Sequence, residues 1–289
     1  MPAVASSLSI IIVNWNTREL LRECLAALTK DEGRKTKDEP PWSLVLGPSS
    51  DVIVVDNASA DGSVEMVQRE FPDIHLIVNE NNLGFARANN RGIAASRGRY
   101  VLLLNSDTVA SAAALDALIA FMDAHPEAGA VGPRLLRPNG TAQPYAFGGD
   151  PTLGYLLRRG FNRLLRRRYL HDWNTDAIQE VDWVSGACLM ARRAAVEQAG
   201  PLDESMFMYF EDNEWCLRIR KAGWKVYYDP QAAIVHLGGQ SVAKNPAARQ
   251  AYTRSLRIFY RKHYGVLAYA IMDVLLLLYQ SVMGRSRQD

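Results

Sequence analysis

Two short polar turns, each directly after an apolar run, carry the residue types in this chain that could do chemistry. Residues 52–55 run into Asp56, and residues 101–104 run into the polar triplet 105–107, which ends in Asp107. Four-residue runs of β-branched residues or leucine are typical of strands buried on both faces of a parallel sheet. The carboxyl ends of such strands hold the ligand in open α/β sheets. We therefore predict that the two carboxylates lie at neighbouring strand ends, one accepting hydrogen bonds and the other holding a cation.

An alternation of strands and helices would position these turns. The apolar pattern predicts strands at residues 9–13, 52–55, 75–79 and 100–104, and helices at 19–28, 63–70, 85–96 and 112–124. Such alternation indicates a parallel, doubly wound α/β sheet. We expect residues 30–50 to form an unusually long loop and residues 133–150, rich in Pro and Gly, to form a second one.

The composition is that of an ordinary globular protein. The chain has 289 residues, of which 48% are hydrophobic and 22% charged, and its net charge is +2. This balance gives no indication of a nucleic-acid partner. Three cysteines without metal-type spacing, Cys24, Cys188 and Cys216, indicate reduced thiols in a cytosolic protein. No basic segment precedes the first predicted strand, so we expect no signal peptide.

Two segments are of a kind found at membrane surfaces. Residues 158–168 hold six arginines and no acid, which fits a solvated basic face or a helix on an anionic membrane. Residues 266–283 are nearly all apolar but are interrupted by Asp273 and Gln280. The apolar segment is slightly short for a bilayer span of about 20 residues. A span, a helix lying on a membrane, and a core or homo-oligomer interface are therefore the three alternatives.

Phosphate-binding motifs of two common classes are missing. The sequence has neither G-x-G-x-x-G after a strand nor G-x-x-x-x-G-K-[ST], which removes the main support for a dinucleotide-binding or P-loop protein. Phosphates on a ligand would then be neutralised in another way, most simply by a divalent metal.

Seven sequence blocks together resemble the inverting glycosyltransferases of family 2, most closely their rhamnosyltransferase-like branch. The blocks are residues 11–16, 55–62, 82–92, 104–107, 183–187 and 210–212, and His236. Each block alone is weak, but their joint order and spacing match the family over most of the chain. The resemblance implies the α/β GT-A fold, a Rossmann-like, mostly parallel sheet flanked by helices, with a C-terminal helical tail.

The resemblance also implies a nucleotide-sugar site in the first half of the chain. Asp56 would accept hydrogen bonds from the N–H of a uracil or thymine ring, or alternatively would cap the turn that follows it. The backbone of Val13 and Asn14 would flank the base and ribose. Further positions that correspond to the family's nucleotide pocket are Asn57, Arg87, Asn89 and Asn90. A surface arginine is the alternative for Arg87.

Asn105, Ser106 and Asp107 take the place of the family's D-x-D motif, with Asn in place of the first carboxylate. Asp107 would be the direct metal ligand, and Asn105 would hydrogen-bond or ligate weakly. The metal would bridge the two phosphates and stabilise the leaving nucleoside diphosphate. Oxygen ligands favour Mg²⁺, whereas an imidazole from His236, which matches the family's late His, would shift the preference toward Mn²⁺. A structural histidine is the alternative.

Glu211 and Asp212 form the candidate catalytic pair. Direct displacement at an anomeric carbon needs one base and no covalent enzyme nucleophile. The family places this base at the second acid, here Asp212, and Glu211 would bind the acceptor or support the base. Stabilisation of a helix start is the alternative for both acids.

Trp183, Ser185 and Gly186 match the stretch that faces the donor sugar and the acceptor in the family. Trp183 would form an apolar platform under a sugar ring. Packing in the core is the alternative for this side chain.

We therefore expect a GT-A domain at residues 1–245, with a donor half at about 7–132 and an acceptor half at about 133–245, followed by a helical tail at 246–289. The implied activity is metal-dependent inverting transfer of a sugar, and the resemblance favours L-rhamnose from dTDP-rhamnose. The two membrane-type segments fit a glycan or polyprenyl-diphosphate-linked acceptor at the cytoplasmic face of the cell membrane, in bacterial cell-wall or surface polysaccharide synthesis.

Three other activities are alternatives. The donor could be a UDP-sugar, or the protein could be a catalytically weak scaffold that binds a nucleotide sugar. A nucleotidyltransferase would need a glycine-rich, basic N-terminal loop, and residues 14–17 offer neither property.

Overall fold

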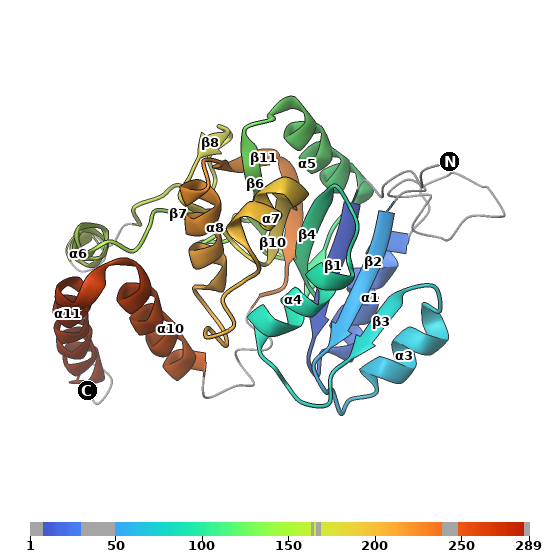
Figure 1. Cartoon of the computed structure of the whole chain (residues 1–289), viewed down its shortest axis with the longest axis horizontal. Helices are drawn as coiled ribbons and strands as arrows, with labels where there is room; N and C mark the ends of the chain where they lie inside the picture. Colours follow the sequence, from blue (N-terminus) through green and yellow to red (C-terminus); the bar gives the residue numbers. More distant parts are fainter. Residues whose placement is uncertain (1–7, 30–49, 163–164, 166–168, 239–247, 286–289) are drawn as a thin grey trace.

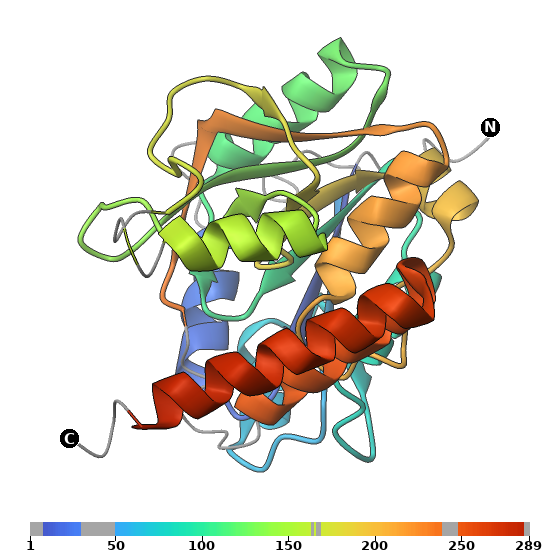
Figure 2. The ribbon, with the colours of Figure 1, turned by 90° about the vertical axis from the view of Figure 1, so that its left-hand side faces the viewer.

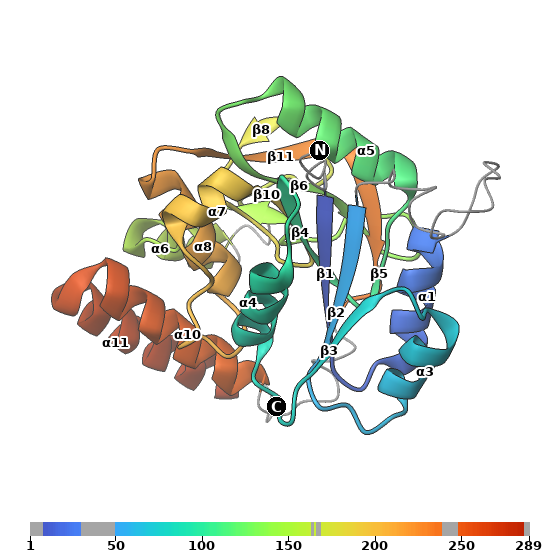
Figure 3. The ribbon, with the colours of Figure 1, turned by 45° about the vertical axis from the view of Figure 1, so that its right-hand side comes forward.

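A central mixed sheet covered by helices forms the body of the molecule (Figures 1 and 3). The computed structural model describes residues 8–29, 50–162, 165, 169–238 and 248–285, with side chains described up to residue 278. The predicted loop at 30–50 lies outside these residues except for Ser50, which begins a strand. The sheet and its flanking helices have the predicted GT-A arrangement.

Four parallel strands form the first half of the sheet, in the order β3-β2-β1-β4. They are β1 (Leu8–Asn14), β2 (Ser50–Asp56), β3 (His75–Val78) and β4 (Tyr100–Asn105). The helices of this half are α1 (Arg18–Thr29), α3 (Ser63–Glu70), α4 (Phe85–Ala95) and α5 (Ala112–Ala124). Each predicted helix and strand of this half is confirmed, and α3 and α5 have the predicted bounds.

The second half continues the same sheet from β4 in the order β10-β6-β11-β5. These strands are β5 (Thr108–Val109), β6 (Ala128–Leu136), β10 (Cys188–Arg192) and β11 (Lys225–His236), with β8 (Gln179–Glu180) beside β11. A separate small pair consists of β7 (Phe147–Gly148) and β9 (Trp183–Val184). Strand β10 is antiparallel to both β4 and β6. It therefore joins the two halves through backbone hydrogen bonds.

The predicted loop at residues 133–150 is wrong at both ends. Residues 133–136 continue β6, and Phe147 and Gly148 form β7. Burial of Leu135 and pairing of β6 with β11 stabilise an extended strand despite Pro133. The predicted boundary between donor and acceptor halves thus falls inside a strand.

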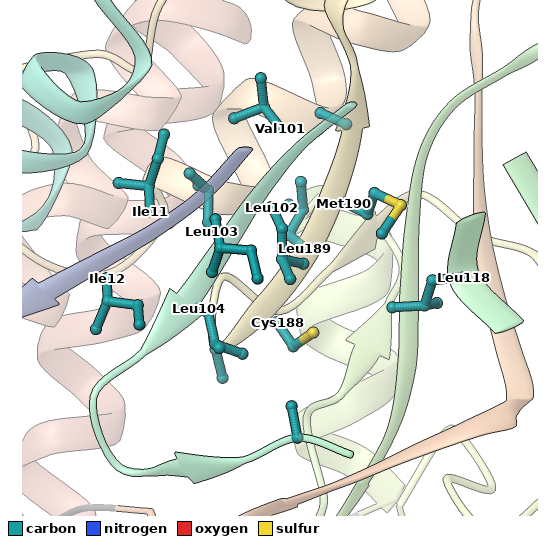
Figure 4. Close-up of a cluster of buried hydrophobic side chains, with 14 of the residues drawn as sticks. Ile11, Ile12, Val101, Leu102, Leu103, Leu104, Leu118, Cys188, Leu189 and Met190 are labelled. Carbon is teal, nitrogen blue, oxygen red and sulfur yellow. The ribbon is translucent and has the colours of Figure 1, made fainter. Parts of the chain in front are cut away.

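The apolar runs of the sheet form the main core. Figure 4 shows side chains of β1, β4 and β10 packed together, including Ile11, Leu103 and Met190. Buried in this core are Cys24 and Cys188, and the third free thiol, Cys216, is also buried. Burial raises the pKa of Cys24 and of Cys216 to about 12, which keeps both as neutral thiols.

A second apolar cluster joins the C-terminal helices to the body. The remaining helices are α6 (Leu153–Phe161), α7 (Arg193–Ala199), α8 (Glu211–Lys221), α10 (Ala248–His263) and α11 (Gly265–Arg285). Leu256, Phe259 and Tyr260 of α10 pack with Phe210 and Leu217 of the body. Figure 2 shows α10 and α11 lying along one side of the molecule. Among the described helices, none combines the length and the hydropathy that crossing a bilayer requires.

The first prediction concerns this second cluster. Phe259 is fully buried, so Phe259→Ala should lower the free energy of unfolding by about 3–5 kcal/mol, because it removes apolar contacts and leaves a cavity. Urea denaturation followed by circular dichroism measures the change. The control is Leu267→Ala on α11, whose side chain is 76% exposed and whose loss should change the free energy by no more than about 0.5 kcal/mol. Equal effects of the two substitutions would contradict the packing of α10 on the body.

Candidate active site

The carboxyl ends of the parallel strands meet at one edge of the sheet, as the sequence predicts. Asn14 at the end of β1 lies opposite Asp56 at the end of β2, and Val13 lies opposite Asn105 of β4. This register brings the predicted polar residues of three strands to one level. The edge is therefore a platform on which a ligand can be bound.

A cavity of about 440 Å³ opens at this edge and is large enough for a small-molecule ligand. Predicted site residues in its lining are Val13, Asn57, Asn105, Ser106, Asp107, Ser185, Gly186, Glu211, Asp212 and His236. Further lining residues are Trp15, Asn82, Gly84, Phe85, Ala187, Phe207, Met208 and Tyr209. Residues from the sheet edge and from the start of α8 thus face one shared space.

Asp56 lies beneath this lining and is only 1% exposed. Its Oδ1 accepts a hydrogen bond from Nδ2 of Asn14 at 2.9 Å, and its Oδ2 accepts one from the backbone N–H of Ser59 at 2.8 Å. The second hydrogen bond caps the turn after β2. This capping is the role given above as the alternative to ligand binding for Asp56. A direct contact between Asp56 and a ligand base stays a prediction.

Asp107 and His236 lie together on the sheet-edge side of the cavity. His236 Nε2 is 3.2 Å from Asp107 Oδ1 and 3.4 Å from Nδ2 of Asn105. The second ring nitrogen, Nδ1, is 2.9 Å from Oε1 of Gln143. A ring whose Nδ1–H donates to the glutamine oxygen turns the Nε2 lone pair toward the carboxylate. In this orientation Nε2 and the carboxylate oxygen both turn lone pairs to the space between them, which is an arrangement that suits a cation.

This pair fits a divalent metal whose remaining ligands come from a bound substrate. Among the described residues, no group of three or more His, Cys, Asp or Glu side chains could hold an ion by itself. Mg²⁺ is commonly held by one or two carboxylates together with substrate phosphates rather than by an all-protein cage. One carboxylate and one imidazole beside a ligand-sized cavity match that pattern, and the imidazole also suits Mn²⁺.

Asp212 and Glu211 begin α8, and both line the cavity. Asp212 Oδ2 accepts a hydrogen bond from the backbone N–H of Gly186 at 2.9 Å. Its Oδ1 accepts one from the backbone N–H of Asn213 at 2.8 Å. Burial raises the pKa of Asp212, and these N–H groups oppose the rise. Burial, together with the charge of Asp212, raises the pKa of Glu211 well above its usual value. The two acids therefore have different tendencies to ionise.

Comparison with known proteins identifies the family. Residues 9–197 match the family model described as glycosyl transferase family 2. The chain belongs to this family. The match includes the polar strand ends and the segment around Gly186, while the candidate catalytic pair and His236 lie beyond it.

Relatives of the glycosyltransferase include proteins named as rhamnosyltransferases. It is 33% identical to an N-acetylglucosaminyl-diphospho-decaprenol L-rhamnosyltransferase of Mycobacterium tuberculosis, over 72% of this chain and 73% of the relative. It is 24% identical to the dTDP-rhamnosyl transferase RfbF of Shigella flexneri, over 80% of this chain and 78% of the relative. These relatives support the rhamnosyltransferase-like branch of the family.

Among solved structures, the glycosyltransferase has the fold of a mannosyltransferase from Pyrobaculum calidifontis, solved in complex with GDP-Man and Mn²⁺. The TM-score is 0.55 and the sequence identity 16%, over 96% of this chain and 81% of the other. This likeness establishes the shared GT-A fold.

The turn before the candidate catalytic pair has an unusual backbone. Tyr209 and Phe210, directly before Glu211, both have φ of 67°, in the left-handed region that non-glycine residues rarely adopt. Such conformations persist where the surrounding structure holds them. Here α10 supplies that support, because Ser255 Oγ donates to the carbonyl of Met208 at 2.8 Å and the ring of Phe210 packs against Phe259.

Ion pairs also link α10 to α8. Glu214 is fully buried in the same first turn of α8 as the candidate catalytic pair, and it accepts a hydrogen bond from Lys262 Nζ at 2.6 Å. His263 Nε2 lies 3.1 Å from the same carboxylate oxygen, and Arg218 bonds the other oxygen at 2.8 Å. These contacts orient the helix that carries Asp212.

Besides Asn14, Asp56 and Asn89, three predicted site residues do not line the cavity. Arg87 is exposed and forms an ion pair with Glu204 at 2.9 Å. It is therefore placed as a surface arginine, the alternative given above. Asn90 donates from Nδ2 to the carbonyl of Leu202 at 2.9 Å and ties α4 to the loop before α8. Trp183 donates a hydrogen bond from its ring N–H to the carbonyl of Gly149 at 3.0 Å and packs against the core. This is the packing role given above as the alternative for Trp183. Their roles in ligand binding stay predictions that this geometry does not favour.

Gln143 contacts a candidate site residue, His236, and the sequence patterns do not reveal this contact. It lies between β6 and β7, in the segment predicted as a loop, and orients the ring of His236. A polar side chain in an irregular segment has no periodic signal, and only the paired β6 and β11 bring it to the histidine. The aromatic lining residues Trp15, Phe85 and Phe207 likewise depend on the arrangement of loops.

Proposed function

We propose that this glycosyltransferase transfers a sugar, with inversion, from a nucleotide-diphosphate donor to a hydroxyl group of a polyprenyl-diphosphate-linked glycan. The observation that carries the proposal is the position of Asp212 on the same cavity as Asp107 and His236. A base and a candidate metal pair around one ligand-sized space are the two groups that such a transfer requires.

The reaction is a displacement at the anomeric carbon of the donor sugar. Asp212 takes the proton of the acceptor hydroxyl while that oxygen bonds to the anomeric carbon on the face opposite the leaving group. The bond from this carbon to the diphosphate oxygen breaks, the nucleoside diphosphate departs with the electron pair, and the configuration inverts. The N–H groups of Gly186 and Asn213 hold the Asp212 carboxylate in place during this step.

Asp107 and His236 would hold a divalent metal, Mg²⁺ or Mn²⁺, at the sheet edge. When bound, this ion supplies positive charge to the phosphates of the donor and of the leaving diphosphate. Asn105 lies close enough to His236 to hydrogen-bond within the same site. Gln143 keeps the ring of His236 in the orientation that turns Nε2 toward Asp107.

For the donor we propose dTDP-L-rhamnose. The relatives from Mycobacterium tuberculosis and Shigella flexneri support this sugar by their names. The name of the mycobacterial relative also supports a lipid-linked acceptor, of the kind used in cell-wall or surface polysaccharide assembly.

The test is a panel of dTDP-rhamnose, UDP-glucose, UDP-galactose, UDP-GlcNAc and GDP-mannose, each with Mn²⁺, Mg²⁺ or EDTA. A donor at 100 times its Kd should stabilise the protein by about 2.7 kcal/mol in thermal unfolding. Metal-dependent stabilisation by dTDP-rhamnose, followed by transfer to a synthetic polyprenyl-diphosphate glycan, is the expected result. Stabilisation by a UDP-sugar and not by dTDP-rhamnose would show that the donor is a UDP-sugar. Binding of a donor without transfer to any acceptor would favour a scaffold that only binds the nucleotide sugar.

A second prediction concerns Gln143. Gln143→Ala should weaken the apparent affinity for Mn²⁺ in the presence of donor by about 10–100-fold, because an unheld histidine ring loses its orientation. Metal titration of donor-dependent thermal stability measures this affinity. Gln143→Glu, which keeps an acceptor for Nδ1–H, is the matched control and should lose less. Unchanged metal affinity in the Gln143→Ala variant would indicate that His236 does not bind the metal.

We also propose that the face formed by α6 and α11 lies on the membrane that carries the acceptor. Exposed apolar side chains of α11 are Val266, Leu267, Ile271, Val274, Leu277 and Leu278, and those of α6 are Leu157 and Phe161. Figures 1 and 2 show the two helices on the same side of the molecule. Arg158 and Arg159 in the last turn of α6 add the positive charge that attracts anionic lipids.

A third prediction tests this face. The combined variant Leu267→Gln, Val274→Gln and Leu278→Gln should bind anionic vesicles at least about tenfold more weakly, because each exposed apolar side chain loses its burial in lipid. Vesicle sedimentation measures the bound fraction. Val78→Gln, at an exposed position on β3, is the control and should bind like the wild type. Unchanged recovery of the combined variant with vesicles would exclude α11 from membrane contact.

A further inference from the structure

Glu211 and Asp212 are neighbours in the sequence, but their carboxyl groups have opposite surroundings. Both oxygens of Asp212 accept backbone N–H groups. Glu211 is 6% exposed, and its Oε2 is buried without a hydrogen-bond partner among the described residues. A buried carboxylate oxygen without a donor is costly, whereas a protonated carboxyl can itself donate.

The charged groups around Glu211 favour the same assignment. Asp212 lies beside it on α8, and Tyr209 precedes it on the turn. The carboxylate of Asp107 and the ring of His236 line the same cavity from the sheet edge. Burial and the charge of Asp212 both raise the pKa of Glu211. Asp212, in contrast, accepts backbone N–H groups that favour its ionised form. Of the two acids, Glu211 therefore has the surroundings that favour the neutral form more strongly.

We propose that Glu211 works as a neutral carboxylic acid whose O–H donates a hydrogen bond to a sugar hydroxyl oxygen in the cavity. The inference rests on the proposed glycosyl transfer and assigns a role in it that differs from that of the base. Asp212 accepts a proton, and Glu211 keeps its proton and orients a sugar. The bound hydroxyl, on either the donor sugar or the acceptor sugar, supplies the partner that Oε2 lacks.

Substitution of Glu211 tests the donated hydrogen bond. Glu211→Ala should lower kcat/KM by about 10–100-fold, because the sugar hydroxyl loses a buried partner. Glu211→Gln keeps an N–H donor of similar size and should recover most of this loss. A rise in KM for the acceptor or for the donor shows which sugar carries the hydroxyl. Equal losses in the Gln and Ala variants, or full activity of Glu211→Ala, would overturn the proposal.

The pH dependence of kcat/KM separates a proton donor from a second anion. Activity should rise with pH as Asp212 ionises and fall at higher pH as Glu211 loses its proton. Glu211→Gln should remove the fall and leave the rise at the same pH, because a neutral side chain replaces a neutral side chain. A rise that moves to lower pH in this variant would mean that Glu211 is charged in the wild type, and would overturn the proposal.

Infrared difference spectroscopy supplies a readout that does not need turnover. The wild type at neutral pH should show the C=O band of a protonated carboxylic acid, and Glu211→Gln should lack it. Absence of this band in the wild type would overturn the assignment of the proton. A protein that shows the band but transfers no sugar would instead contradict the proposed function and leave the protonation of Glu211 established.

Discussion

Asp212→Asn should lower kcat by about 10²–10⁴-fold, the contribution that a positioned general base makes. The donor Kd should change by no more than a few-fold, because the amide has nearly the shape of the carboxylate. Its oxygen can still accept the N–H of Gly186, so α8 keeps its position. What the variant loses is the ability to take the acceptor's proton. Transfer kinetics with radiolabelled donor and equilibrium binding of the same donor measure the two quantities separately.

The control for this substitution is Asp116→Asn, at an exposed position on α5 outside the cavity lining. It should transfer sugar at the wild-type rate. An Asp212→Asn enzyme with a comparable rate would show that the base is another group. A large loss of donor affinity in the variant would instead indicate that Asp212 acts mainly in binding.

Asp107→Ala should abolish metal-dependent donor binding. The wild type, with donor at 100 times its Kd and with Mn²⁺, should gain about 2.7 kcal/mol of stability, and the variant should gain almost none. The physical reason is that Asp107 would supply the carboxylate of the proposed metal pair, and His236 alone would be a weak site for a divalent ion. Thermal unfolding with Mn²⁺ and with EDTA measures the difference.

Asp116→Ala is the matched control and should respond to donor and metal like the wild type. The decisive comparison is the donor-induced stabilisation of Asp107→Ala with metal and with EDTA. If the variant shows the full metal-dependent gain, Asp107 is not a metal ligand, and the contact between His236 and Asp107 is a structural ion pair.

The fold was predictable where the sequence repeats a simple pattern. Buried strands such as β4 read as apolar runs, and amphipathic helices such as α3 and α5 have clear ends. The segment at 133–150 was mispredicted because Pro and Gly normally indicate a loop, and only pairing with β11, far away in the sequence, extends β6 through Pro133. Contacts between distant segments leave no local pattern.

The site was predictable to the level of the strand ends and the start of α8. Ten of the predicted residues line one cavity because strand register places them there. Arg87 and Trp183 lie outside this lining, because the side of a helix or strand on which a side chain leaves the backbone depends on packing. Trp183 points to the carbonyl of Gly149, and Arg87 points to Glu204. Gln143 was missed because its partner is 93 residues away.

The support that α10 gives to the turn at Tyr209 and Phe210 has a consequence for how the enzyme is made. The proposed base, Asp212, is synthesised before its support, since α10 begins at Ala248. A nascent chain that ends before α10 can contain the strand ends of β1, β2 and β4 but lacks the contacts that hold the turn before Asp212. We therefore expect nascent chains to acquire donor binding earlier than transfer activity.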